Sequence, residues 1–262
     1  MNKMLPYISF SICILFVFSC TQSADTLFQQ KSASNTGITF NNIIIENDSI
    51  NPLDLEYLYN GGGVGIADFN NDGLQDIYFT ASQVSNKLYL NKGNFTFDDI
   101  TETAGVAGNG RWCNGVSVVD VNNDGLQDMY VCASIKKKGI DRTNLLYINQ
   151  GIDKKGIPIF KEMAAAYGLA DTAYSVQAAF FDYDKDGDVD MYLVTTKMST
   201  RNITNFGNYE KDTIIPDADK LYRNDGIGKD NHPTYTEVSK KRSEEPRLNS
   251  SHPSISRMPS SA

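Results

Sequence analysis

The sequence predicts an all-β fold of repeated four-stranded antiparallel units, the arrangement found in the blades of a β-propeller. Three observations predict it: one acidic loop occurs three times, a short apolar segment lies on each side of every copy, and a phrase ending in Asn-x-Gly follows. The loop begins at Asp68, Asp120 and Asp182, and four strands at this spacing describe a propeller blade better than a solenoid unit. We therefore expect three blades of an incomplete propeller.

The strands of each unit are predicted from residue type. The segments beside the loops are rich in β-branched, aromatic and other apolar residues, and Asn-x-Gly is hairpin-turn chemistry because both residues tolerate positive φ. The predicted strands span 63–68, 76–80, 87–93 and 95–100, then 115–120, 128–132, 145–151 and 159–163, then 177–182, 190–195, 220–226 and 235–238. An insertion at about 197–219 lengthens the third unit. Tyr78, Tyr130 and Tyr192 share one repeat position and are expected to pack between blades.

Each loop has the spacing of a calcium site. Oxygen-bearing side chains stand at positions 1, 3, 5 and 9, a glycine stands at position 6, and position 7 offers its backbone carbonyl. Ca²⁺ takes about 6–8 oxygen ligands at about 2.3–2.6 Å, and ligands at alternate residues before a sharp turn suit it. The predicted ligands are Asp68, Asn70, Asp72, Leu74 and Asp76; Asp120, Asn122, Asp124, Leu126 and Asp128; and Asp182, Asp184, Asp186, Asp188 and Asp190.

The EF-hand loop begins in the same way, but two features exclude it here. An EF-hand needs a bidentate Glu at position 12 and a helix on each side of the loop. Position 12 is Phe79, Val131 or Leu193, and both flanks predict strands. The last carboxylate of each loop therefore opens a strand, and each loop joins the two strands of a hairpin.

The runs at 63–79, 88–93 and 178–190 resemble FG-GAP/VCBS repeat proteins, which form calcium-binding β-propellers related to the head of integrin α-subunits. The resemblance covers about residues 60–241, since loop, hairpin and turn recur in order. It implies Ca²⁺ on the three loops. Asn70 and Asn122 replace the Asp of the pattern at position 3, which lowers the charge of those two sites. The resemblance implies a fold and a metal, but it does not imply one function.

Residues 1–20 predict a lipoprotein signal peptide. Lys3 precedes an apolar run from Leu5 to Phe18, which is too short for a comfortable membrane span. The small Ser19 before Cys20 resembles a bacterial lipobox, so Cys20 would carry the lipid of an exported outer-membrane or cell-surface lipoprotein. Residues 21–36 would be a linker. An ordinary secretory signal with an incidental Cys is the alternative.

Residues 242–262 differ abruptly in composition from the repeats and resemble adapter DNA translated in frame. We expect this tail to be non-native, with 37–241 a partial propeller and further blades in the natural protein downstream. A genuine disordered tail of Ser and Pro is the alternative.

The chain is acidic, with a formal net charge of −8, and shows no basic patch that would indicate nucleic acid. Cys113 and Cys132 read as buried small hydrophobic residues, and a disulfide between them is the minority alternative. His232 is the only histidine before the tail, and neither a Ser-His-Asp set nor a phosphate-binding loop is present.

Two functions remain open. We expect a non-catalytic envelope lipoprotein whose propeller binds a protein or glycan, with Ca²⁺ stabilising the loops. The alternative is the N-terminal part of a propeller-type polysaccharide lyase or hydrolase whose active site lies in sequence beyond these residues.

Overall fold

A computed structural model describes residues 27–239, except for residues 54, 56, 136–138 and 197–217. The chain divides into two compact units, Met1–Ser32 and Ala33–Ala262, and every strand given below belongs to the second. The predicted signal peptide, Cys20 and the predicted non-native tail lie outside the described residues. Within the described residues, no helix is long and apolar enough to cross a membrane.

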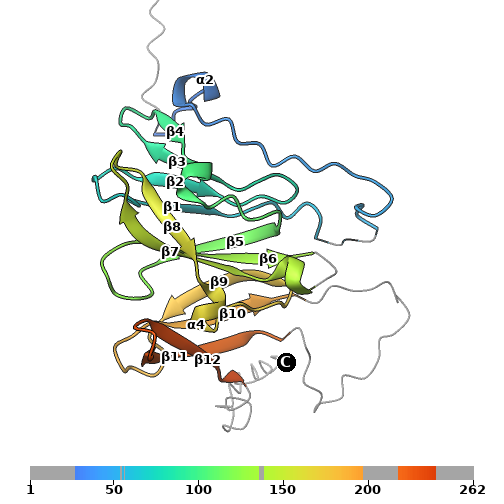
Figure 1. Cartoon of the computed structure of the whole chain (residues 1–262). Coiled ribbons are helices and arrows are strands. Elements are labelled where there is room, and N and C mark those ends of the chain that lie inside the picture. Colours follow the sequence, from blue (N-terminus) through green and yellow to red (C-terminus); the bar gives the residue numbers. More distant parts are fainter. Residues whose placement is uncertain (1–26, 54, 56, 136–138, 197–217, 240–262) are drawn as a thin grey trace, which may run out of the picture. The chain divides into compact units, whose positions relative to one another are not determined.

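The second unit contains three four-stranded antiparallel sheets, one for each predicted repeat (Figure 1). Sheet 1 contains β1 (Val64–Ala67), β2 (Asp76–Phe79), β3 (Lys87–Asn91) and β4 (Phe97–Asp99). Sheet 2 contains β5 (Trp112–Val119), β6 (Asp128–Ser134), β7 (Leu145–Ile152) and β8 (Pro158–Glu162). Sheet 3 contains β9 (Ser175–Phe181), β10 (Asp190–Thr195), β11 (Lys220–Ile227) and β12 (Pro233–Glu237). Neighbours in each sheet are neighbours in sequence, so the predicted fold class is confirmed and the sheets are consistent with propeller blades.

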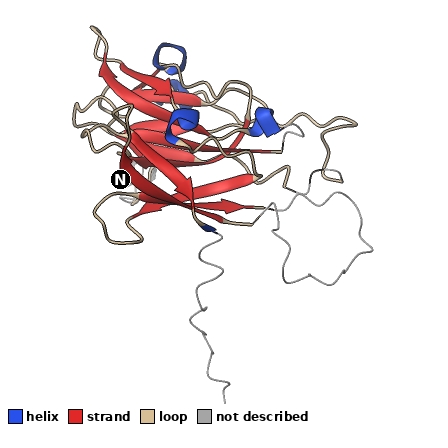
Figure 2. Ribbon diagram, turned by 60° about the horizontal axis from the view of Figure 1, so that its bottom comes forward, coloured by secondary structure: helices blue, strands red, loops and turns tan. Residues whose placement is uncertain are grey.

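Helices occupy little of the described chain (Figure 2). They are α2 (Ala33–Thr36), α3 (Thr101–Ala104), α4 (Ala164–Tyr167) and a 3₁₀ turn, η2 (Gly139–Arg142). Three of them end at glycines in the left-handed region, namely Gly37, Gly105 and Gly168, which is the usual αL cap. These helices were not predicted from the sequence, and α2 lies in the segment that was predicted to be a linker.

The segments after Gly105 and Gly168 join one sheet to the next, and the segment after Gly37 leads into sheet 1. The N–H of Gly108, after α3, donates to the Tyr147 hydroxyl of sheet 2 (3.2 Å). After α4, the Asp171 carboxylate accepts a hydrogen bond from Tyr222 of sheet 3. The N–H of Thr39, after α2, donates to the hydroxyl of Tyr89 in sheet 1 (3.2 Å). The residues after α2 thus contact sheet 1 as the other two segments contact sheets 2 and 3.

Two apolar cores lie between the sheets. Tyr78 belongs to the core shared by sheets 1 and 2, and Tyr130 belongs to the core shared by sheets 2 and 3. Both tyrosines are fully buried, as predicted. Tyr192 differs, because it is half-buried and donates to Asp219 (2.9 Å) on the face of sheet 3 that points away from sheet 2.

The two described cysteines are buried free thiols, as predicted. Cys113 belongs to the core between sheets 1 and 2, whereas Cys132 belongs to the core between sheets 2 and 3. Their side chains therefore lie on opposite faces of sheet 2. Burial raises the pKa of Cys113 to about 11, so this thiol stays protonated at neutral pH.

Candidate metal centre

The three acidic loops occupy equivalent places, each between the first and second strand of its sheet. Position 6 of each loop, Gly73, Gly125 or Gly187, has a φ of 88°, 85° or 98°. A Cβ at these positions would meet no atom within 4 Å. Glycine is therefore required by the backbone conformation rather than by lack of space.

The first Asp of each loop closes the loop on itself. Asp68 accepts hydrogen bonds from the N–H groups of Asp72 (3.0 Å) and Gly73 (2.7 Å), and the second loop repeats both bonds. In the third loop, Asp182 accepts from Lys185 (2.6 Å) and Gly187 (3.2 Å). The backbone N–H groups thus hold one carboxylate over the middle of each loop.

The last Asp of each loop is fully buried and links the loop to the Asn-x-Gly turn. Asp128 accepts from the N–H of Val121, at loop position 2 (3.1 Å), and from the N–H of Asn149, which begins the turn (2.7 Å). Asp76 and Asp190 make the same two bonds in their own sheets. The two repeated phrases of the sequence are therefore parts of one hydrogen-bonded unit.

In the first two loops, burial makes the last carboxylate costly to ionise. It raises the pKa of Asp76 to about 6 and that of Asp128 to about 7, although the two backbone N–H groups act in the opposite direction. The other two carboxylates of these two loops raise the pKa further by repulsion. A cation inside the loop would offset both effects.

The third loop gathers the densest set of carboxylates. Oxygens of Asp182, Asp184 and Asp190 lie within 4.8 Å of one another, the one such group of three found among the described residues. Next to them, Oδ1 of Asp188 is buried without a hydrogen-bond partner. Burial, followed by the hydrogen bond and charge of Asp186, raises the pKa of Asp188 to about 6. Converging carboxylates beside an unsatisfied oxygen fit a cation that prefers oxygen ligands.

The first two loops differ at position 3. Asn70 donates its side-chain amide to Asp72 (2.9 Å), and Asn122 donates to Asp124 (2.8 Å). Asp184 has no amide hydrogen to donate, so the third loop concentrates uncompensated negative charge. The structure thus assembles an all-carboxylate cluster in the third loop. The ligand roles assigned to the residues of all three loops stay predictions.

Position 7 is held from its N–H side. The N–H of Leu74 donates to Asp72 (2.8 Å), that of Leu126 to Asp124 (2.8 Å), and that of Asp188 to Asp186 (3.2 Å). The predicted use of the position 7 carbonyls as ligands stays a prediction.

The asparagines of the Asn-x-Gly turns are partners of the loops, and the sequence did not predict this role. Asn149 is fully buried, and its amide donates to the Phe69 carbonyl of the first loop (2.9 Å) and to the Gln127 carbonyl of the second (3.2 Å). The only signal in the sequence is that the turn and the loop always recur together.

The fold and the loops are those of a repeat protein in which each four-stranded antiparallel sheet carries an acidic loop in its first hairpin. The FG-GAP-like repeat family matches residues 68–131, from the start of the first loop to β6 in sheet 2. The match supports the predicted resemblance for this part of the chain. No curated protein matches the sequence.

Proposed function

We propose that this protein is a non-catalytic, calcium-binding lipoprotein of the bacterial cell envelope, whose repeated sheets bind a protein or glycan. The observation that carries the metal part is the group formed by Asp182, Asp184 and Asp190 beside the unpartnered Oδ1 of Asp188. The match to an FG-GAP-like repeat supports calcium as the cation.

Calcium in such a loop supplies positive charge where the fold has placed carboxylates too close together. In the third loop, Asp182, Asp184, Asp186 and Asp190 would hold it through side chains and Asp188 through its carbonyl. The chain itself fixes the first and last of these carboxylates with backbone N–H groups. The site therefore has a structural role, because it joins the first strand of the sheet to the second and to the Asn-x-Gly turn.

The first prediction is that calcium stabilises the protein. Extracellular calcium modules bind at roughly 10⁻⁴–10⁻³ M. At about 100 times the dissociation constant, each site adds about 2.7 kcal/mol if only the folded state binds. Melting curves recorded with calcium and with EGTA should therefore differ, and Asp186→Ala should remove the part of the shift that comes from the third loop.

The matched control is Asp98→Ala, which removes an exposed carboxylate of β4 outside the loops. Its calcium-dependent shift should equal that of the unmodified protein. A melting temperature that EGTA leaves unchanged would contradict the calcium assignment for all three loops.

The second prediction concerns the lipid anchor. A lipobox cysteine becomes the modified N-terminus of the mature protein, so Cys20→Ser should abolish incorporation of labelled palmitate, while Cys13→Ser should leave it unchanged. Labelling and membrane fractionation of bacteria that express each variant measure this. Palmitate on the Cys20→Ser protein would refute the assignment of the anchor.

A further inference from the structure

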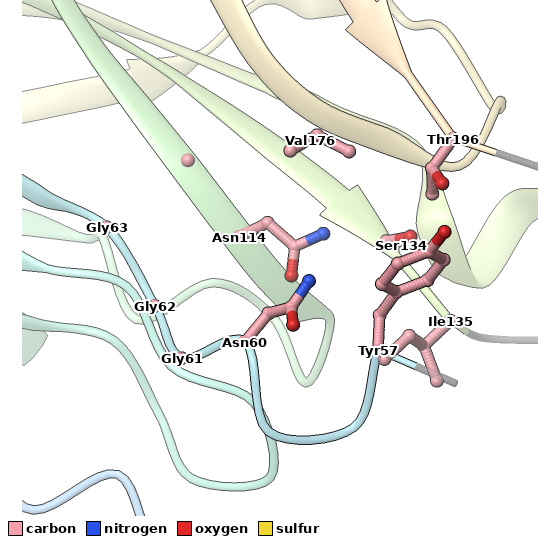
Figure 3. Close-up of a pocket in the computed structure, with 11 residues that line it drawn as sticks. Tyr57, Asn60, Gly61, Gly62, Gly63, Asn114, Ser134, Ile135, Val176 and Thr196 are labelled. Carbon is pink, nitrogen blue, oxygen red and sulfur yellow. The ribbon is translucent and has the colours of Figure 1, made fainter. Parts of the chain in front are cut away.

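A pocket of about 270 Å³ lies where β5 and β9 begin, at the end of the sheets away from the acidic loops (Figure 3). It is smaller than the roughly 300–1,000 Å³ of pockets for drug-sized ligands, so its size suits a single ring. Its walls come from the segment before β1, from the first residues of β5 and β9, and from the C-terminal ends of β6 and β10.

Three departures from regular backbone surround this pocket. β5 has a bulge at Asn114 and Gly115, where the pairing shifts between Cys113 and Val116. β9 has another at Val176, because Thr195 pairs with Ser175 while Val194 pairs with Gln177. Bulges that re-aim side chains are frequent beside binding sites.

The third departure is Ile135, a β-branched residue with a φ of 62°. Such a residue in the left-handed region is a genuine outlier, and strained residues cluster at ligand sites. The Ile135 side chain packs into a small core with Leu55, Leu58 and Trp112. Through Leu55 and Leu58, that core holds the segment with Tyr57 and Asn60 against sheet 2. This wall of the pocket is therefore in place before a ligand binds.

The polar groups of the pocket are neutral. Asn60 and Asn114 both project into the pocket (Figure 3), and Thr196, the residue that follows β10, also lines it. Asn114 donates one amide hydrogen to the Ser175 carbonyl (2.9 Å), which orients the amide. A side-chain amide offers both a donor and an acceptor, and so does each hydroxyl of a sugar.

The remaining wall is apolar, formed by the Tyr57 ring with Ile135 and Val176. The described residues that line the pocket include no carboxylate, amine, guanidinium or imidazole. These described residues offer a charged ligand no counter-charge for its lost hydration, whereas a neutral ring with hydroxyl edges and a C–H face matches both walls.

We infer that this pocket binds one neutral pyranose ring, with the amides of Asn60 and Asn114 on its hydroxyls and Tyr57 against its C–H face. The inference rests on the proposed function, because it names a glycan as the ligand and gives the place where it binds.

The test is ligand-observed NMR and calorimetry of the full chain in calcium, with glucose, galactose and N-acetylglucosamine as neutral probes and galacturonate as the anionic probe. At least one neutral sugar should bind, and galacturonate should bind more weakly. Tyr57→Ala and Asn60→Ala should each weaken binding about tenfold, which corresponds to the loss of one aromatic or hydrogen-bonded contact. The exposed Tyr59, outside the pocket, supplies the control Tyr59→Ala, which should bind as the unmodified protein does.

Failure of all three neutral sugars to bind overturns the inference, as does tighter binding of galacturonate or unchanged binding by folded Asn60→Ala protein. Asn60 is exposed, so its variant should fold even if Tyr57→Ala does not. Calcium melting curves on the same samples separate the two proposals. A calcium shift without sugar binding rejects the pocket alone, whereas sugar binding without a calcium shift rejects the calcium assignment.

Discussion

Asn149→Ala is expected to lower the free energy of unfolding by about 3 kcal/mol. Asn149 is fully buried, and its side chain satisfies the carbonyls of Phe69 and Gln127 and the N–H of Gly151. A buried polar group left without a partner costs about 1–3 kcal/mol. Three such groups would lose their partner together, so their costs add. Because water can reach some of them, the total loss should lie near the lower end of the summed range. Urea denaturation in EGTA measures the effect without a contribution from calcium.

The repeat supplies the control, because Asn91 holds the same position in sheet 1. Asn91 makes the two bonds within its own sheet, to the Gln75 carbonyl and from the Gly93 N–H, but it is only half-buried. Water can replace its partners, so Asn91→Ala should cost about 1 kcal/mol or less. Equal losses for the two variants would show that the bond from Asn149 to Phe69, which links sheets 1 and 2, contributes little.

The strands and loops were predictable because each rests on a local pattern. Apolar residues beside the acidic phrase predict strands, and oxygen ligands at alternate positions before Gly73, Gly125 and Gly187 predict the turn. The structure bears out the sheets and their order. It also explains why position 9 had to be Asp, since two backbone N–H groups from separate segments meet there.

Features that depend on contacts between distant segments were not predictable. The pocket combines residues from five places in the chain, and the bulges of β5 and β9 leave no mark in composition. The helix α2 does have a signal in the sequence, namely a glycine followed by an aliphatic residue. Gly37 and Ile38 match Gly105 and Val106 after α3, and Gly168 and Leu169 after α4. That signal is two residues long, so it becomes visible only once the other two helices are known.

The surroundings of the third loop, which differ from those of the other two, could not be predicted from the sequence either. The sequence shows five carboxylates in that loop, but not that Oδ1 of Asp188 would be buried without a hydrogen-bond partner. The Asn at position 3 of the first two loops lowers their charge, as expected. The structure adds that its amide also takes up one oxygen of the carboxylate at position 5.

Gly168→Ala should destabilise the protein by about 3 kcal/mol, because two separate effects add. Gly168 has a φ of 76°, and a left-handed conformation costs an L-residue roughly 1–2 kcal/mol. A Cβ there would also lie 2.5 Å from the Tyr235 carbonyl of β12. Backbone cannot move aside as a flexible side chain can, and such overpacking typically costs about 1–3 kcal/mol. Thermal or urea denaturation gives the total.

Gly105→Ala separates the two effects, because Gly105 caps α3 as Gly168 caps α4 and has nearly the same φ, 77°. The nearest atom to its added Cβ would be the Phe160 carbonyl oxygen at 3.6 Å, an ordinary contact. This variant should therefore show the conformational cost alone, about 1–2 kcal/mol. A larger loss of stability for Gly168→Ala than for Gly105→Ala means that α4 and its cap are packed tightly against sheet 3. The helix is then part of the packing interface between sheets 2 and 3. Equal losses would mean that the helix can shift, and that the apolar core shared by those sheets fixes their positions without it.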